Sequence, residues 1–162
     1  MRIIGIDPGL AIIGFGILDC TANNAIRPVT YGCIKTPSTD PTDQRLLAIQ
    51  KNLRTILQEY HPNTCGIERL YFSKNVKTAM TVSQACGVIL CTLAEFNIPI
   101  SDYTPTTVKS TIIGHGKATK HQIQFMTKEL LGLAATPKPD DVADALAVGI
   151  CHRYWSSVKL TP

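Results

Sequence analysis

The residue pattern at the start of the chain places the strongest constraint on its fold. Apolar and glycine residues from Ile3 to Ile6 lead directly into the carboxylate of Asp7, and the turn residues Pro8 and Gly9 follow. An apolar run bounded by turn residues predicts a strand buried on both faces of a sheet. Asp7 would then end a central strand, where a negative charge is costly unless it is paired or bound to a metal. A second interpretation stays open here, because an Asp before a turn also accepts hydrogen bonds from that turn.

Further apolar segments predict a mixed sheet. Leu10–Leu18 and Val29–Lys35 have the composition of strands, and short turns make them antiparallel neighbours of the first strand. A helical pattern then precedes the short strand Thr64–Glu68, and a strand–helix–strand order implies a right-handed crossover with parallel pairing. We therefore expect Glu68 at the same edge of the sheet as Asp7.

The remaining segments are mostly helical. Apolar spacing predicts a short strand at Pro99–Asp102 and helices at Leu46–Tyr60, at Val76–Glu95, through Lys109 to Ile112 with Thr104 or Thr106 as cap, at Thr119–Leu131 and at Asp140–Tyr154. The expected fold is α/β, with a mixed five-stranded sheet (three antiparallel strands, then parallel strands) and helices on both faces. We assign residues 1–155 to one domain and 156–162 to a flexible tail.

Composition narrows the class of protein. The net charge of +4 permits an anionic partner without requiring one. The six cysteines form no C-x-x-C pair, which indicates reduced thiols of a cytoplasmic protein rather than a zinc site or a disulfide framework. The chain has no signal-peptide pattern and no run of 18 apolar residues, so we expect no membrane association.

Three acidic residues open the last predicted helix. Asp141 and Asp144 share a helix face, and Asp140, four positions before Asp144, could share it as well. A cap or a helix-dipole partner explains Asp140 well and Asp141 acceptably, but it explains Asp144 poorly because that residue lies in the second turn. If this face packs against the strand ends, the helix acids meet Asp7 and Glu68.

Such a cluster of carboxylates requires protonation or bound cations. Two unit charges roughly 4 Å apart repel by about 4 kcal/mol at an effective dielectric constant of about 20. Carboxylate oxygens select hard divalent ions, so we expect Mg²⁺, with Mn²⁺ able to substitute. Two such ions bridged by Asp7 would polarise a phosphodiester, generate the attacking hydroxide and stabilise the leaving 3′-oxygen. The acids therefore predict metal-dependent phosphodiester hydrolysis.

Basic residues gather in a segment without acids. Residues 103–128 contain no Asp or Glu, but they contain Lys109, Lys117, Lys120 and Lys128. A solvated face normally mixes charges of both signs, so this segment favours a surface for the phosphate backbone of a nucleic acid.

Basic and aromatic residues interleave directly after Glu68. Tyr71 lies between Arg69 and Lys74, an arrangement that could stack an aromatic ring on an unpaired base. Adjacent aromatic residues after a strand also cap a core, and Phe72 fits that role.

Four motifs together resemble the RuvC-type Holliday junction resolvases. They are Gly5-Ile6-Asp7-Pro8-Gly9 with a following Gly-x-Gly, Ile67-Glu68 running on to Lys74-Asn75, Gln84-Ala85-x-Gly87, and Asp141-x-x-Asp144-Ala-Leu. Their order and spacing extend from residue 3 to about 152. The resemblance implies a ribonuclease-H-like fold, a homodimer, and symmetric cleavage of four-way DNA junctions together with the branch-migration proteins RuvA and RuvB.

The resemblance also implies roles for single residues. The family's four metal-binding acids correspond to Asp7, Glu68, Asp141 and Asp144. The D-x-x-D-A-L register selects Asp141 and leaves Asp140 as the helix cap. Tyr71 corresponds to an aromatic residue that contacts unpaired junction bases, and Lys109 and Lys120 correspond to lysines needed for activity.

Two other classes of protein share parts of this pattern. Sugar kinases and actin-like ATPases also open with a strand, an Asp and a glycine hairpin, but they need a second domain and another phosphate loop, which 162 residues cannot hold. A non-catalytic junction-binding module would be indicated by loss of any of the four acids, and none is lost. Small residues such as Ser83 and Gly87 in the second predicted helix allow close helix approach, either in the core or to a second subunit.

Overall fold

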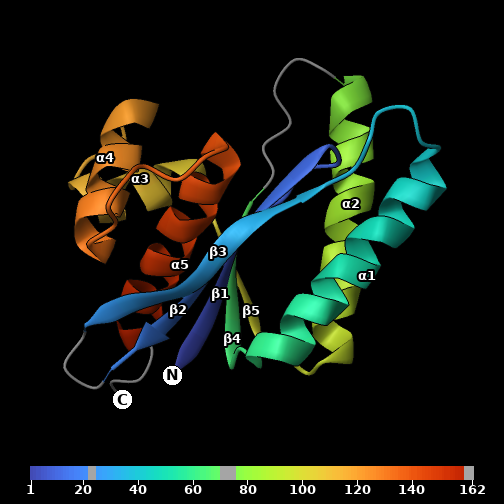
Figure 1. The fold of residues 1–162 in the computed structure, drawn as a ribbon. Coiled ribbons are helices and arrows are strands. Elements are labelled where there is room, and N and C mark those ends of the chain that lie inside the picture. Colours follow the sequence, from blue (N-terminus) through green and yellow to red (C-terminus); the bar gives the residue numbers. More distant parts are fainter. Residues whose placement is uncertain (22–24, 70–75, 159–162) are drawn as a thin grey trace.

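Five strands form one mixed sheet in the order β3-β2-β1-β4-β5 (Figure 1). The structure is a computed structural model that describes residues 1–21, 25–69 and 76–158. The strands span Arg2–Asp7 (β1), Ile12–Cys20 (β2), Ile26–Lys35 (β3), Thr64–Glu68 (β4) and Ile100–Tyr103 (β5). β2 is antiparallel to β1 and β3, whereas β4 is parallel to β1 and β5. The predicted mixed sheet is confirmed.

Helices cover both faces of this sheet, as Figure 1 shows. One face carries α1 (Thr42–Tyr60) and α2 (Val76–Glu95), and the other carries α3 (Pro105–Ile113), α4 (Lys120–Leu131) and α5 (Asp140–Val158). Each face has its own apolar core. None of the described helices combines the length and the apolar character that crossing a bilayer requires.

Strand alternation distributes the side chains of each strand between the two faces. In β1, Ile4 and Ile6 belong to the core beneath α1 and α2. Because successive side chains of a strand point to opposite faces, Gly5 and Asp7 lie on the α5 face. β4 alternates in the same way, and its last residue, Glu68, also lies on the α5 face. Alternation therefore places both strand acids under the same helix.

α5 lies close to the sheet because glycines line its path. Gly16, Gly5 and Gly66 are register partners on β2, β1 and β4. A Cβ atom at Gly5 would collide with the carbonyl oxygen of Ala145, and one at Gly66 would lie 2.7 Å from the Cβ atom of His152. This row was not foreseen from the sequence, although glycines at equivalent positions of three neighbouring strands are a recognisable signal of close helix approach.

Several elements extend beyond their expected ends, and β3 and α5 are two of them. β3 begins at Ile26 rather than near Val29, because an edge strand tolerates a residue such as Pro28 that has no N–H to donate. α5 continues to Val158 rather than ending near Tyr154.

Candidate active site

Two parallel strands bring Asp7 and Glu68 to the same edge of the sheet. Ile6 pairs with Ile67 in the β1–β4 register, so the two acids that follow lie at the same level, as the sequence predicted. Burial, together with the negative charges of Glu68 and Asp144, raises the pKa of Asp7 to about 8. The pKa of Glu68 is also raised, chiefly by burial, although a hydrogen bond from Asp7 opposes the rise. The raised pKa favours a protonated Asp7 that donates a hydrogen bond to Glu68.

The first turn of α5 lies directly beside these strand acids. Gly14 on β2 is the register partner of Asp7, and a Cβ atom at Gly14 would collide with the carbonyl oxygen of Asp141. The negative charge of Asp141 contributes to the raised pKa of Asp7. Asp141 thus belongs to the same electrostatic cluster as the strand acids.

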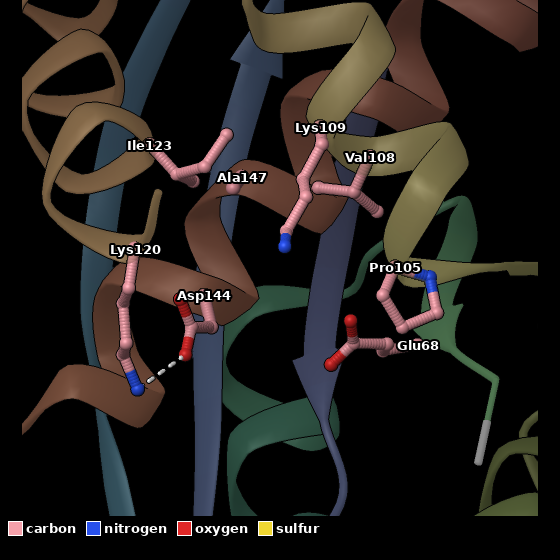
Figure 2. A pocket seen from close by; sticks show the side chains of 8 residues that line it. All are labelled: Glu68, Pro105, Val108, Lys109, Lys120, Ile123, Asp144 and Ala147. Atoms are coloured by element: carbon pink, nitrogen blue, oxygen red, sulfur yellow. Dashed lines mark ion pairs between the residues drawn. The ribbon is translucent and has the colours of Figure 1, made fainter. Parts of the chain in front are cut away.

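Asp144 lies one turn further along α5 and faces a cavity of about 180 Å³ (Figure 2). The residues that line this cavity are Glu68, Pro105, Val108, Lys109, Lys120, Ile123, Asp144 and Ala147. The Nζ atom of Lys120 lies 3.1 Å from Oδ2 of Asp144 and 3.5 Å from Oδ2 of Asp140. Burial raises the pKa of Asp144, while Lys120 opposes that rise.

Asp140, which the sequence suggests as the helix cap, is the first residue of α5, and its carboxylate pairs with Lys120. This ion pair depends on the position of α4, whose first residue is Lys120 and whose docking brings that charge to the start of α5.

The predicted lysines occupy different positions around the cavity. Figure 2 shows Lys109 from α3 and Lys120 from α4 reaching into it. Lys117 is exposed in the segment between α3 and α4.

α3 is capped by Thr104, whose side chain accepts a hydrogen bond from the backbone N–H of Thr107, and not by the alternative Thr106.

Arg69 lies apart from the other predicted site residues. It follows Glu68 and so points toward the opposite face, where it forms an ion pair with Asp102 of β5. It also borders a hollow with α2 residues. Tyr71 and Lys74 fall outside the described residues.

The donor set of this site suits a hard divalent cation, because every side-chain donor of the four acids is a carboxylate oxygen. Among the residues that the structure describes, no three His, Cys, Asp or Glu side chains surround one point closely enough to hold an ion. Asp7 is hydrogen-bonded to Glu68, and the ammonium group of Lys120 contacts Asp144. A divalent cation bound to these carboxylates would supply positive charge in place of the proton that the raised pKa favours on Asp7 and in place of the Lys120 ammonium group.

Comparison with known proteins identifies the family of this chain. Residues 3–152 match the family described as Crossover junction endodeoxyribonuclease RuvC. Proteins of that description from Desulforamulus reducens and Alkaliphilus oremlandii are 48% and 51% identical; the alignments cover 97% and 95% of this chain, and 96% and 93% of theirs. The structure of Thermus thermophilus RuvC in complex with a Holliday junction substrate is 26% identical, with a TM-score of 0.89 over 98% of this chain and 96% of that one. The chain belongs to the RuvC family of crossover junction endodeoxyribonucleases.

Proposed function

We propose that this protein resolves four-way DNA junctions by cutting phosphodiester bonds symmetrically near the crossover, in homologous recombination and DNA repair. The observation that carries the proposal is the charged cluster on the α5 face. There, Asp7 and Glu68 end adjacent strands, the α5 acids lie beside them, and two lysines enter the same cavity. Clustered acids next to a cationic rim are suited to hydrolysis of a polyanion.

The family's nuclease activity depends on a divalent metal ion. We infer that the ligands are Asp7, Glu68, Asp141 and Asp144, that Mg²⁺ is the physiological ion with two bound per site, and that Mn²⁺ can substitute. When bound, such ions polarise the phosphodiester and activate water. Asp7 has to release its proton to become a ligand, so metal binding is coupled to deprotonation. Asp144 has to exchange its contact with Lys120 for a contact with the cation.

The lysines are suited to bind the DNA backbone. Lys109 and Lys120 lie beside the acids, and we infer that they contact the phosphates next to the scissile bond. Lys117 is exposed in the segment between α3 and α4, the helices that carry Lys109 and Lys120, and we infer that it extends this basic surface. For the segment after β4, interleaved charge and aromaticity support a role for Arg69 and Lys74 on the backbone, with Tyr71 stacking on an unpaired base.

Symmetric cleavage requires two active sites, and we propose a homodimer built through α2. Gly87 has open space around its Cβ position, and Met80 and Leu90 on the same helix are 64% and 38% exposed. An apolar helix face with a small residue at its centre permits close approach of a second copy.

Leu90→Glu should therefore produce a monomer that cuts one strand of the four-way junction without the matching cut in the opposite strand. Sedimentation at micromolar concentration checks this, and a fully active wild-type monomer would contradict it.

We also propose that the enzyme acts in the cytoplasm with RuvA and RuvB. The six cysteines, all in the described part of the chain, form no disulfide, which suits a reducing compartment. The partnership with RuvA and RuvB is what the resemblance to the RuvC family implies, and it suits a reaction in which a junction is moved to a cleavable position before it is cut.

The decisive experiment incubates the protein with a synthetic four-way junction whose strands carry separate labels. With Mg²⁺ or Mn²⁺ we expect paired nicks at symmetric positions, and no comparable cutting of a linear duplex with the same sequence. Equal cleavage of the duplex would rule out junction selectivity. Tight junction binding without cleavage in either metal would instead favour a non-catalytic junction-binding module.

A further inference from the structure

A buried histidine joins α5 to two strands of the sheet. His152 is 2% exposed. Its Nδ1 atom lies 2.8 Å from the Tyr103 hydroxyl on β5, and its Nε2 atom lies 2.8 Å from the Thr64 hydroxyl on β4. The Tyr103 ring also packs edge-on against the imidazole, with 5.7 Å between ring centroids. Both ring nitrogens therefore contact hydroxyl groups on different strands.

The hydrogen bonds of this group run in one direction. The Thr64 hydroxyl donates to the carbonyl oxygen of Pro99 at 3.1 Å, so its lone pair accepts from the Nε2–H group of His152. Nδ1 is then the acceptor for the Tyr103 O–H group. Burial raises the pKa of Tyr103, which keeps that hydroxyl protonated as a donor. The arrangement is satisfied by one neutral tautomer, in which Nε2 carries the hydrogen.

The Thr64 contact lies at the opposite end of β4 from the acids, whereas Tyr103 is the register partner of Glu68 and its side chain reaches back to His152. His152 follows Asp144 by eight residues, or about two helical turns on the same face of α5. Thr64 is the first residue of β4 and Glu68 is the last. α5 thus spans β4, with His152 bonded at the start of the strand and Asp144 facing the cavity at its end.

The glycine row makes directional bonds important for the position of α5 along its axis. Gly5 and Gly66 allow the helix backbone to approach and present no side chains of their own to α5, while Leu18 lies against Gly149 and Leu146 against Gly16. Hydrogen bonds depend strongly on distance and angle, so those of His152 add a directional constraint on axial position to this apolar packing.

We propose that His152 is a positioning residue, whose bonds to Tyr103 and Thr64 set the register of α5 on β4 and thereby hold the α5 acids opposite the strand acids. Its effect on cleavage rests on the proposed metal-dependent function. Its effect on the placement of α5 does not.

Three variants test this role against one control. Tyr103→Phe and Thr64→Val each remove one hydroxyl with little change in volume, and His152→Gln keeps donor and acceptor atoms in the side chain. The control is Thr92→Val on α2, where a fully buried hydroxyl donates to the Val88 carbonyl oxygen at 2.7 Å on the other face of the sheet. All four variants remove or alter a buried hydrogen bond, but only the first three alter the connection to α5.

The readouts are amide hydrogen exchange of residues 141–147, the rise in Tm caused by Mn²⁺, and the Mg²⁺ concentration that gives half-maximal cleavage. For Tyr103→Phe and Thr64→Val we expect faster exchange, a smaller Mn²⁺-induced rise in Tm, and a half-saturating Mg²⁺ concentration raised by about 3- to 10-fold. This is less than the roughly 10- to 100-fold typical of residues bonded directly to a metal ligand, because His152 acts through the placement of α5. Junction binding in EDTA should not change. His152→Gln should show smaller effects, and Thr92→Val should lower Tm without changing the exchange or the metal dependence.

The proposal is overturned if both hydroxyl variants lower Tm like the control while exchange and Mg²⁺ dependence stay within about twofold of wild type. Should His152→Gln fail to fold, the two hydroxyl variants still give that decision. If wild-type protein cuts no junction, the proposed function fails, while the exchange comparison still determines whether His152 places α5.

Discussion

The two faces of the sheet pack in different ways, although the same strands supply both. Under α1 and α2, branched side chains such as Ile6, Ile49 and Ile89 fill the space between sheet and helices. Under α5, Gly5 and Gly66 bring the helix backbone against the strands. Packing between large side chains tolerates volume-conserving changes, whereas backbone contact leaves no room for adjustment. The face with backbone contact is the one that carries the acids.

Two strand acids show the same contrast in their charge states. Asp102, on the α2 face, is paired with Arg69, and that hydrogen bond holds its pKa below the usual value. Asp7, on the α5 face, is buried among other acids, and its pKa is raised to about 8. The first acid is already neutralised by a side chain. Among the described residues, Asp7 forms no ion pair of this kind, and such a buried acid is suited to bind a cation from solution.

The largest effect should come from removing Asp7. Asp7→Asn keeps the volume but removes the negative charge, so we expect junction cleavage to fall by about 1,000-fold or more while junction binding in EDTA persists. Asp102→Asn, on the opposite face, should keep cleavage within a few fold of wild type. Rates from labelled junctions at saturating Mg²⁺ test both, and wild-type-like cutting by Asp7→Asn would end the metal-site assignment.

The next largest effect separates two neighbouring acids. Asp141→Asn should reduce cleavage by roughly 100-fold or more, because its charge belongs to the cluster around Asp7. Asp140→Asn should remain active, since its carboxylate pairs with Lys120 at the rim. The same junction assay measures both variants. The opposite ranking would move the metal ligand by one residue.

Two glycine substitutions compare the packing of the faces directly. Gly5→Ala places a methyl group against the α5 backbone and should lower the free energy of unfolding by about 3 kcal/mol. Gly87→Ala adds a methyl group on α2 that meets no atom of its own chain, so helix propensity should raise the free energy of unfolding by up to about 1 kcal/mol when both variants are made in the Leu90→Glu background, which separates the proposed dimer. Urea denaturation of both variants provides the measurement. Equal stability of the two would show that α5 can move away from the sheet freely.

The last expected effect is a pH dependence of stability in metal-free protein, which concerns folding and not cleavage. Folded Asp7 keeps its proton up to about pH 8, whereas an unfolded Asp loses its proton near pH 4. Between these values the folded state binds more protons, so the contribution of Asp7 to the free energy of unfolding falls as pH rises, by at most about 1.4 kcal/mol per pH unit. In EDTA, Asp7→Asn should therefore gain Tm relative to wild type at pH 8 but not at pH 4. An equal difference in Tm at both pH values would contradict the raised pKa.

The strand acids could be predicted from the sequence because their placement depends on local patterns. An apolar run marks each strand, and parallel connection places Asp7 and Glu68 at one edge. Side chains of a strand alternate between the two faces, and one more residue beyond Glu68 places Arg69 on the opposite face. The mixture of basic and aromatic residues in this segment instead suggested that Arg69 lies with the site residues. The contact between Lys120 and Asp144 could not be predicted, because it depends on how α4 docks, and no periodicity encodes that. Likewise, the glycine row has meaning only once the register of three strands is known.

The contact between β1 and α5 has a consequence for the protein during its synthesis. Asp7 lies on the first strand and Asp141 and Asp144 lie on the last helix, so a chain that has been synthesised only as far as β5 carries half of the acid cluster. A nascent or truncated polypeptide of that length should therefore be unable to cut DNA, however well its sheet has formed. The acid cluster is therefore complete only after α5 has been synthesised and has docked on the sheet, so nuclease activity is expected only from the full-length folded chain.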